Sequence, residues 1–253
     1  MSLFLIQVVS VVSSIVLYLL YLTGFPITYS PMKFYYIWTI YTNALVDDEW
    51  YLFVIYLAVH VACLSYFIKR WGIKEFCNFF VLIATTTALV FTIYIILKSL
   101  ILMDMQYAVV GNLEGLQGIC IAYLVAFKQL IPEHMIKLGN VNIIRFKHTA
   151  GVYLIIHSAF CIFVLSFTSF LNVFTGFLTA WVYLRYFKVY VLGRTYIKGD
   201  RSATFSLSTF FPSQIRGWFL TPSMLVDQFM ERIFGKKKIV VYEQQSRASE
   251  KSR

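Results

Sequence analysis

Two pairs of metal-ligating side chains have the spacing of neighbours on one helix face. His60 precedes Cys63 by three residues, and His157 precedes Cys161 by four. Tetrahedral zinc accepts imidazole and thiolate ligands, so four ligands would converge if two such helices touched. We favour the alternative that each histidine is neutral and hydrogen-bonded to a neighbour, because both pairs lie in long apolar segments where buried zinc is uncommon. We predict no metal and no cofactor.

Acidic side chains suggest two further sites. Glu114 precedes Gln117 by three residues, so the two side chains can meet on one helix face. An ionisable group in an apolar helix is a functional candidate, although a glutamate near a helix entrance can equally face interfacial water. The acidic trio at 47–49 resembles a cation site, but carboxylates also stabilise a helix N-terminus, which we favour. The sequence contains no P-loop, GxSxG elbow or HExxH motif.

Small side chains form a stripe along one of the apolar segments. Its members are Gly111, Gly115, Gly118, Ala122 and Ala126. At 100° per residue they fall within an arc of about 80° on a helix. Such a stripe lets another helix approach closely, and Gly176 with Ala180 is the natural partner. We interpret these residues as helix-packing positions.

Composition identifies the environment of these segments. Of the 253 residues, 59% are hydrophobic and only 13% are charged, against about 25% charged in soluble globular proteins. This balance excludes a soluble enzyme, a disordered protein and a nucleic-acid binder, and it makes the lipid bilayer the expected surroundings. The four cysteines, Cys63, Cys77, Cys120 and Cys161, all fall in apolar stretches. They are expected to be small hydrophobic side chains and not disulfides.

Hydropathy predicts an all-α integral membrane protein with six spans. A helix needs about 20 apolar residues to cross the bilayer core. Six segments meet or approach this length: 3–23, 50–68, 76–97, 113–131, 149–170 and 171–192. The first lacks the basic start and the small-residue cleavage site of a signal peptide, so it is expected to stay as a helix. Only the segment 169–172 offers a turn between the last two spans.

The distribution of charge supports this count and its direction. With six spans and cytosolic termini, 20 of the 22 Lys and Arg residues fall on the cytosolic side. Only Lys33 and Lys98 fall on the other side, together with most of the acidic residues between the spans. Cytosolic loops of membrane proteins carry an excess of Lys and Arg. The asymmetry therefore predicts that both termini are cytosolic.

The chain is expected to divide into a membrane domain, residues 1–192, and a basic cytosolic tail, residues 193–253. The tail begins as a polar, irregular stretch and contains a short amphipathic helix near 222–234. Thr221 is its expected N-cap, and Pro222 suits its first turn. Lys236, Lys237 and Lys238 follow the helix, which suits binding to an anionic membrane surface. The alternative is a helix packed on the membrane domain or on a partner.

Several motifs resemble those of the transmembrane protein 115 family, a Golgi-resident, rhomboid-like group. They are LVAFKQ at 124–129, WVYLRYF at 181–187, Gly199–Asp200, and TFFP at 209–212. The residues that carry the resemblance are Lys128, Gln129, Trp181, Tyr183, Arg185, Gly199, Asp200, Phe211 and Pro212. The segments around 36–42 and 69–76 are similar to the first half of rhomboid-type proteins. The resemblance implies a rhomboid-like bundle of six transmembrane helices with a cytosolic C-terminal tail.

The resemblance also implies that this bundle is not a protease. Rhomboid proteases use a serine on the fourth span and a histidine on the sixth, and here these positions hold Gln117 and Val173. Neither side chain can form an acyl-enzyme or accept a proton in that role. No catalytic residue is therefore predicted, and the two positions are interpreted as degenerate protease positions.

Further expectations follow from the same family. They are a multi-pass Golgi membrane protein that self-associates, binds the conserved oligomeric Golgi tethering complex, and acts in Golgi-to-endoplasmic-reticulum retrograde transport with an indirect effect on glycosylation. One alternative is an intramembrane hydrolase in which His157 works with a relocated serine such as Ser65 or Ser166. Another is a lipid- or solute-handling protein whose path is lined by Glu114, Gln117 and the two buried histidines. Inverted repeats, common in transporters, are not evident.

Overall fold

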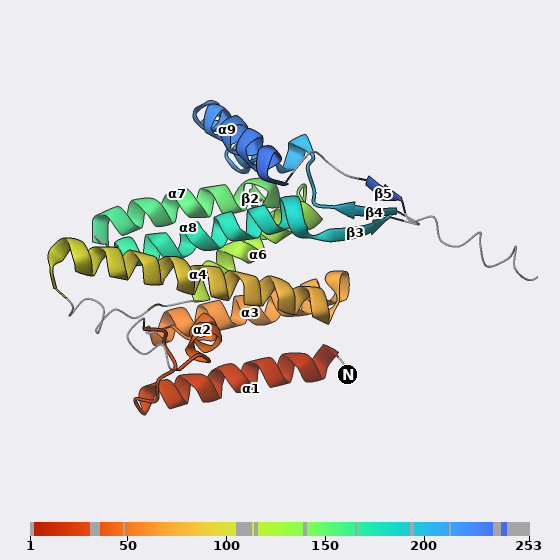
Figure 1. Ribbon diagram of the computed structural model, residues 1–253. Coiled ribbons are helices and arrows are strands. Elements are labelled where there is room, and N and C mark those ends of the chain that lie inside the picture. The colour runs from red at the N-terminus through yellow and green to blue at the C-terminus, as the bar shows by residue number, and fades with distance from the viewer. Residues whose placement is uncertain are drawn as a thin grey trace, which may run out of the picture. The chain divides into compact units, whose positions relative to one another are not determined.

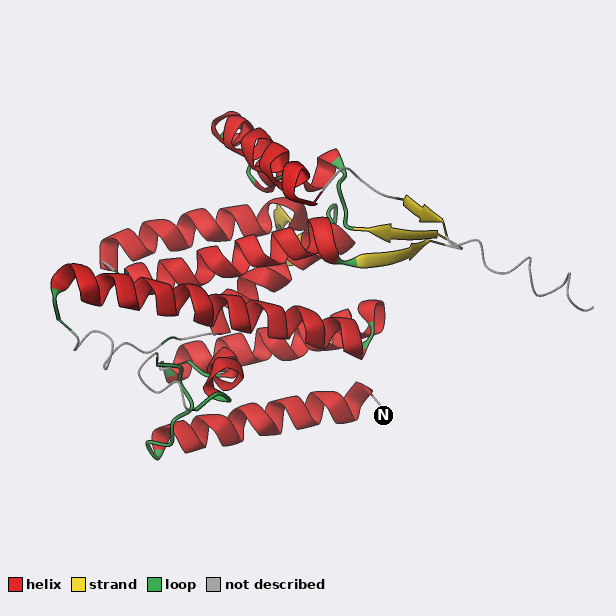
Figure 2. Ribbon diagram, viewed as in Figure 1, coloured by secondary structure: helices red, strands yellow, loops and turns green. Residues whose placement is uncertain are grey.

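The computed structural model describes residues 3–30, 36–47, 49–104, 113, 116–138, 141–164, 166–192, 195–212, 214–234 and 239–241. The chain divides into two compact units, Met1–Ala180 and Trp181–Arg253. The first unit is a helix bundle, and the second combines a small sheet with a helix (Figures 1 and 2).

The bundle contains the helices that hydropathy predicts. Their bounds are α1 Leu3–Leu22, α2 Thr39–Thr42, α3 Trp50–Trp71, α4 Ile73–Leu102, α6 Leu116–Leu130, α7 Phe146–Val164 and α8 Phe167–Val182. A π-helical turn, Tyr183–Phe187, continues α8. Within the described residues, five helices are long and apolar enough to cross a membrane, with α8 counted through Phe187, and α6 is a shorter apolar helix. The predicted all-α membrane fold is confirmed.

Helix α6 is the central helix, although its 15 residues extend only about 22 Å against a bilayer core of about 30 Å. Most of its side chains are buried, and it packs against α3, α4 and α7. Before it, the Leu113 N–H donates to the carbonyl of Tyr29 at 3.0 Å, and both side chains are buried. Non-helical backbone is tolerated at membrane depth only where protein satisfies its polar groups. Enclosure by neighbouring helices therefore allows α6 to be short.

The connections group at two ends of the bundle as the charge pattern predicts. The start of α1, the α3–α4 junction and the hairpin β1–β2 (Met135–Leu138 and Val141–Arg145) lie at one end. The end of α4 and the α7–α8 junction lie at the other (Figure 1). At the hairpin, Lys147 Nζ and Arg145 Nη1 each approach a Glu133 carboxylate oxygen at 3.0 Å. These contacts, led by the hydrogen bond from Lys147, lower the pKa of Glu133.

The break between the last two helices lies earlier than the sequence suggests. Helix α7 ends at Val164 and α8 begins at Phe167, while the N–H of Ser166 donates to the carbonyl of Cys161 at 3.1 Å. The expected turn at 169–172 is wrong, because Ser169 and Asn172 lie inside α8. Ser169 is hydrogen-bonded to Gln117, and Asn172 lies beside Gly118. These polar side chains therefore make contacts between helices and do not form a turn.

Helices α6 and α8 meet backbone to backbone. A Cβ atom added at Gly176 would lie 2.9 Å from the Cα of Gly118 and closer still to its carbonyl oxygen. One turn further along each helix, Ala122 and Ala180 are fully buried. Gly111 and Gly115 lie outside the described residues. The described part of the small-residue stripe therefore includes a close approach of two helix backbones, at Gly118 and Gly176.

The second unit has more regular secondary structure than the polar, irregular start of the tail predicted from the sequence. Strands β3 Val189–Leu192, β4 Thr195–Lys198 and β5 Ile239–Val241 form an antiparallel sheet in that order. Two 3-10 turns, Ala203–Phe205 and Leu207–Phe210, precede helix α9, Arg216–Phe234. This unit begins at Trp181, before the expected boundary at 193, because Trp181 and the turn after it contact later segments. The helix expected near 222–234 starts at Arg216, so Pro222 lies inside it and not in its first turn.

We expect Gly176→Ala to destabilise the bundle, because the new methyl group would overlap the backbone of Gly118. Overpacking of this kind costs about 1–3 kcal/mol, measured as a lower midpoint of thermal unfolding in detergent. The matched control is Gly217→Ala on α9, where an added Cβ meets no atom within 4 Å. Equal midpoints for the two variants would contradict this account of the α6–α8 contact.

Candidate functional site

Gln117 lies at the centre of a polar cluster within the bundle. It is 5% exposed, in the first turn of α6. Ser169 of α8 donates its hydroxyl proton to Gln117 Oε1 at 2.7 Å. The same hydroxyl oxygen lies 3.3 Å from Nε2 of His157, on α7. Three helices thus supply an amide, a hydroxyl and an imidazole to one partly buried cluster.

This arrangement contains a serine and a histidine but not an activated nucleophile. A serine becomes nucleophilic when a base accepts its proton, and a hydroxyl has only one proton to give. Here that proton goes to the Gln117 amide oxygen, which is not a base. Val173, also on α8, is fully buried and offers no polar group. The cluster can therefore hold three helices in register through hydrogen bonds.

A cavity opens where α7 meets α8. Its volume is about 580 Å³. The lining residues are Ser158, Cys161, Ile162, Ser166, Phe167 and Phe170. Its walls are therefore mainly apolar, with small polar groups from two serines and one cysteine. Ser169 lies in the same turn of α8 as Phe170, so the polar cluster is close to this cavity in the chain.

Each of the two histidines lies beside a hydroxyl group. Nδ1 of His60 lies 2.8 Å from the hydroxyl oxygen of Tyr123, while His157 is beside Ser169 as described. Among the residues that the structure describes, no three His, Cys, Asp or Glu side chains are grouped so as to hold a metal ion. The hypothesis that His60, Cys63, His157 and Cys161 converge on one ion is therefore not supported.

The structure describes only some of the acidic residues that the sequence suggested as sites. Asp47 is fully buried, and its Oδ1 accepts the N–H of Glu49, the residue before α3, at 3.4 Å. This position agrees with a role at the helix N-terminus. Asp48 and Glu114 lie outside the described residues, as do Lys236, Lys237 and Lys238.

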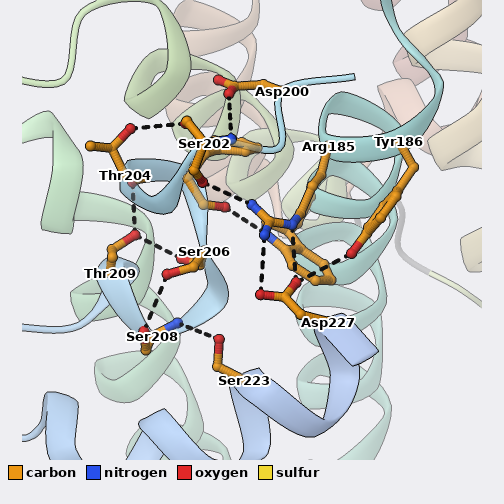
Figure 3. Close-up of polar contacts among 12 residues, drawn as sticks. Arg185, Tyr186, Asp200, Ser202, Thr204, Ser206, Ser208, Thr209, Ser223 and Asp227 are labelled. Carbon is orange, nitrogen blue, oxygen red and sulfur yellow. Dashed lines mark hydrogen bonds and ion pairs between the residues drawn. The ribbon is translucent and has the colours of Figure 1, made fainter. Parts of the chain in front are cut away.

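A second polar cluster lies in Trp181–Arg253 and centres on Arg185 (Figure 3). Nε of Arg185 lies 3.0 Å from Oδ1 of Asp227 on α9, and Nη2 donates to Oδ2 at 3.1 Å. The Tyr186 hydroxyl also donates to this carboxylate, at 3.2 Å. Nη1 of Arg185 donates to the carbonyl of Ser202 at 3.1 Å. Two consecutive residues after α8 thus bind both the loop before the 3-10 turns and the middle of α9.

The other family-like motif residues surround this ion pair. Trp181 is buried and donates from Nε1 to the carbonyl of Phe205 at 3.1 Å. Gly199 has φ +72 and no room for a Cβ, since the carbonyl of Arg185 occupies that space. The N–H of Asp200 donates to the carbonyl of Leu184 at 3.1 Å. These residues build the fold of the second unit, and none of them forms a catalytic grouping.

The remaining motif residues have structural positions as well. The carbonyl of Pro212 accepts the N–H of Arg216 at 3.0 Å, at the start of α9. Phe211 stacks on Phe219 of α9, with ring centroids 3.7 Å apart. Lys128 and Gln129 lie at the end of α6, and Lys128 is buried.

Sequence analysis did not identify Ser169 or Asp227. Ser169 contacts Gln117 across 52 residues, and Asp227 contacts Arg185 across 42. No spacing rule connects residues so far apart. The usable signal was polarity, since each is a polar side chain in a segment where its neighbours are apolar.

Comparison with known proteins places these features in a family. The model of the family eukaryotic integral membrane protein (DUF1751) matches residues 1–250. Rhomboid-like protein 19 of Arabidopsis thaliana is 30% identical over 186 residues, which cover 71% of this chain and 57% of the relative. Transmembrane protein 115 of Bos taurus is 24% identical over 180 residues, covering 70% and 49%. The chain therefore spans about half the length of the curated relatives that it matches.

We expect Asp227→Ala to loosen α9, because it leaves the guanidinium of Arg185, 8% exposed, without its counter-charge. Removing one partner of a buried ion pair costs about 3–5 kcal/mol. Amide hydrogen exchange should therefore become faster across α9 and the 3-10 turns, with little change in α3, α4 and α6. The control is Glu231→Ala, which removes an exposed carboxylate from the same helix. Unchanged exchange in Asp227→Ala would show that the ion pair does not hold α9.

Proposed function

Since the chain belongs to the eukaryotic integral membrane protein family (DUF1751), we propose that it is a rhomboid-like membrane protein without catalytic activity. The observation that carries this proposal is the hydrogen bond from Ser169 to Gln117 Oε1. At the position where a rhomboid protease would present its nucleophile, an amide oxygen accepts a hydrogen bond instead. Gln117 and Val173 are therefore proposed as degenerate protease positions whose role is packing and hydrogen bonding.

We propose that the protein acts as a membrane scaffold in Golgi-to-endoplasmic-reticulum retrograde transport. The proposal follows from the resemblance to the transmembrane protein 115 family, with relatives of that name at 24% and 25% identity. In this proposal it is a Golgi protein that self-associates and contacts the conserved oligomeric Golgi tethering complex, with an indirect effect on glycosylation. Both termini face the cytosol, which is supported by the gathering of 20 of 22 basic residues on one predicted side.

The second unit is the proposed surface for the tether. It holds 13 of the Lys and Arg residues, counted from Arg185 onward. Its sheet, 3-10 turns and α9 form a folded body, and a folded surface can bind a soluble partner without the ordering cost of a disordered tail.

We expect purified tether subunits to be captured by the full chain and not by a chain that ends at residue 192. The truncated chain loses Phe205, Ser202 and Asp227, the partners of Trp181 and Arg185, but keeps the contacts within Met1–Ala180. An unchanged midpoint of thermal unfolding for the bundle is therefore the control. Equal capture by both chains would remove the second unit from the mechanism.

One observation favours an alternative, an intramembrane hydrolase with a relocated site. Oγ of Ser169 lies 3.3 Å from Nε2 of His157, and the residues next to them in the sequence, Phe170 and Ser158, line a cavity of about 580 Å³. A substrate that displaced the Gln117 amide would leave the hydroxyl proton to the imidazole. This alternative requires that rearrangement, whereas the non-catalytic proposal requires none.

We expect a fluorophosphonate probe to leave the full-length protein unlabelled, because the Ser169 proton is already bonded to Gln117. A known serine hydrolase in the same sample shows that the probe is active. Labelling that is lost in Ser169→Ala but kept in Ser166→Ala, a nearby serine that lines the cavity, would establish the alternative and overturn the non-catalytic proposal.

A further inference from the structure

Helix α9 exposes a continuous apolar stripe. Trp218, Leu225, Phe229 and Ile233 are 81%, 62%, 62% and 57% exposed. At 100° per residue they fall within an arc of about 80° on the helix surface. We call these four residues the α9 stripe. Four large apolar side chains aligned on one exposed helix face indicate contact with something other than water.

The opposite face of α9 is occupied. Asp227 is bonded to Arg185 and Tyr186, and the hydroxyl of Ser223 accepts the N–H of Ser208 at 3.3 Å. Phe219 stacks on Phe211. These contacts fix the rotation of the helix about its axis, so the α9 stripe points away from the rest of its unit.

The ion pair also ties α9 to the end of a candidate span. Arg185 and Tyr186 lie in the last turn of the candidate span Phe167–Phe187. Asp227, in the middle of α9, is bonded to both of them. The middle of α9 is therefore held to the last turn of the candidate span by the combined reach of two side chains. A helix long enough to cross the hydrocarbon core ends at about the level of the lipid headgroups.

We propose that α9 is an in-plane interfacial helix whose stripe inserts into the leaflet at which α8 ends. Tryptophan is enriched at the membrane interface, and amphipathic helices bury their apolar face at the boundary of headgroups and acyl chains. Arg232 is exposed on α9, and Lys236, Lys237 and Lys238 follow the helix in the sequence. These positive charges complement an anionic leaflet. The choice of an anionic cytosolic leaflet rests on the proposed orientation, whereas the depth of α9 does not.

The test measures the surroundings of two positions on α9 in the full chain. Cys77, the exposed cysteine, is replaced by serine, and a single cysteine is introduced by Phe229→Cys on the stripe or by Glu231→Cys off it. Each is labelled with an NBD fluorophore after reconstitution in nanodiscs of phosphatidylcholine and phosphatidylserine. Quenching is compared for a nitroxide on the lipid acyl chain near the headgroup and for iodide in the water.

We expect the lipid nitroxide to quench position 229 several-fold more than position 231, and iodide to show the reverse order. Leu225→Cys provides a second stripe position should Phe229→Cys fail to purify as a single species. Strong iodide quenching at both stripe positions would overturn the proposal. Protection from both quenchers would also overturn it, because a protein would then cover the stripe. The measurement needs neither tether nor substrate, so its failure is distinct from failure of the proposed function.

Discussion

The backbone contact between α6 and α8 determines what the membrane unit can do. Lipid tails are as apolar as leucine, so helices associate in a bilayer through close packing and hydrogen bonds and not through the hydrophobic effect. Gly118 and Gly176 permit that packing by leaving no side chain between the two backbones. The same approach brings Gln117, the neighbour of Gly118, to the hydroxyl of Ser169. Gln117, which we propose to be a degenerate protease position, thus lies where two helices are joined by packing and a hydrogen bond.

The second unit depends on a different kind of contact, a guanidinium bonded to a carboxylate at the end of a membrane span. Arg185 reaches Asp227 with two of its nitrogens, and planar bidentate pairing is a geometry that lysine cannot reproduce. Trp181 and Gly199 contact the segments around that pair. The residues that carry the family resemblance therefore have a structural part in this unit.

Much of the bundle could be predicted, because hydropathy and charge can be read directly from consecutive residues of the sequence. The spans appear as long apolar segments, and the grouping of their connections appears as an uneven distribution of Lys and Arg. The small-residue contact appears as a pattern with helical spacing. The break between α7 and α8 was misplaced because Ser169 and Asn172 look like turn residues, and only tertiary contact shows that they are helix contacts. The hairpin β3–β4 was missed because its strands are four residues each, too short to show alternation. The Ser169–Gln117 and Arg185–Asp227 contacts could not be predicted, since they join distant residues that no local rule relates.

The chain returns to the sheet after α9, and this has a mechanical consequence. Ile239 and Val241 of β5 pair with Ile197 and Thr195 of β4, whose hairpin begins two residues after the candidate span ends. Strand β5 is therefore held beside a strand that follows closely, along the chain, on the end of the candidate span. Tension on the C-terminus would be borne first by the β4–β5 backbone bonds, so β5 would detach before α9 felt the load.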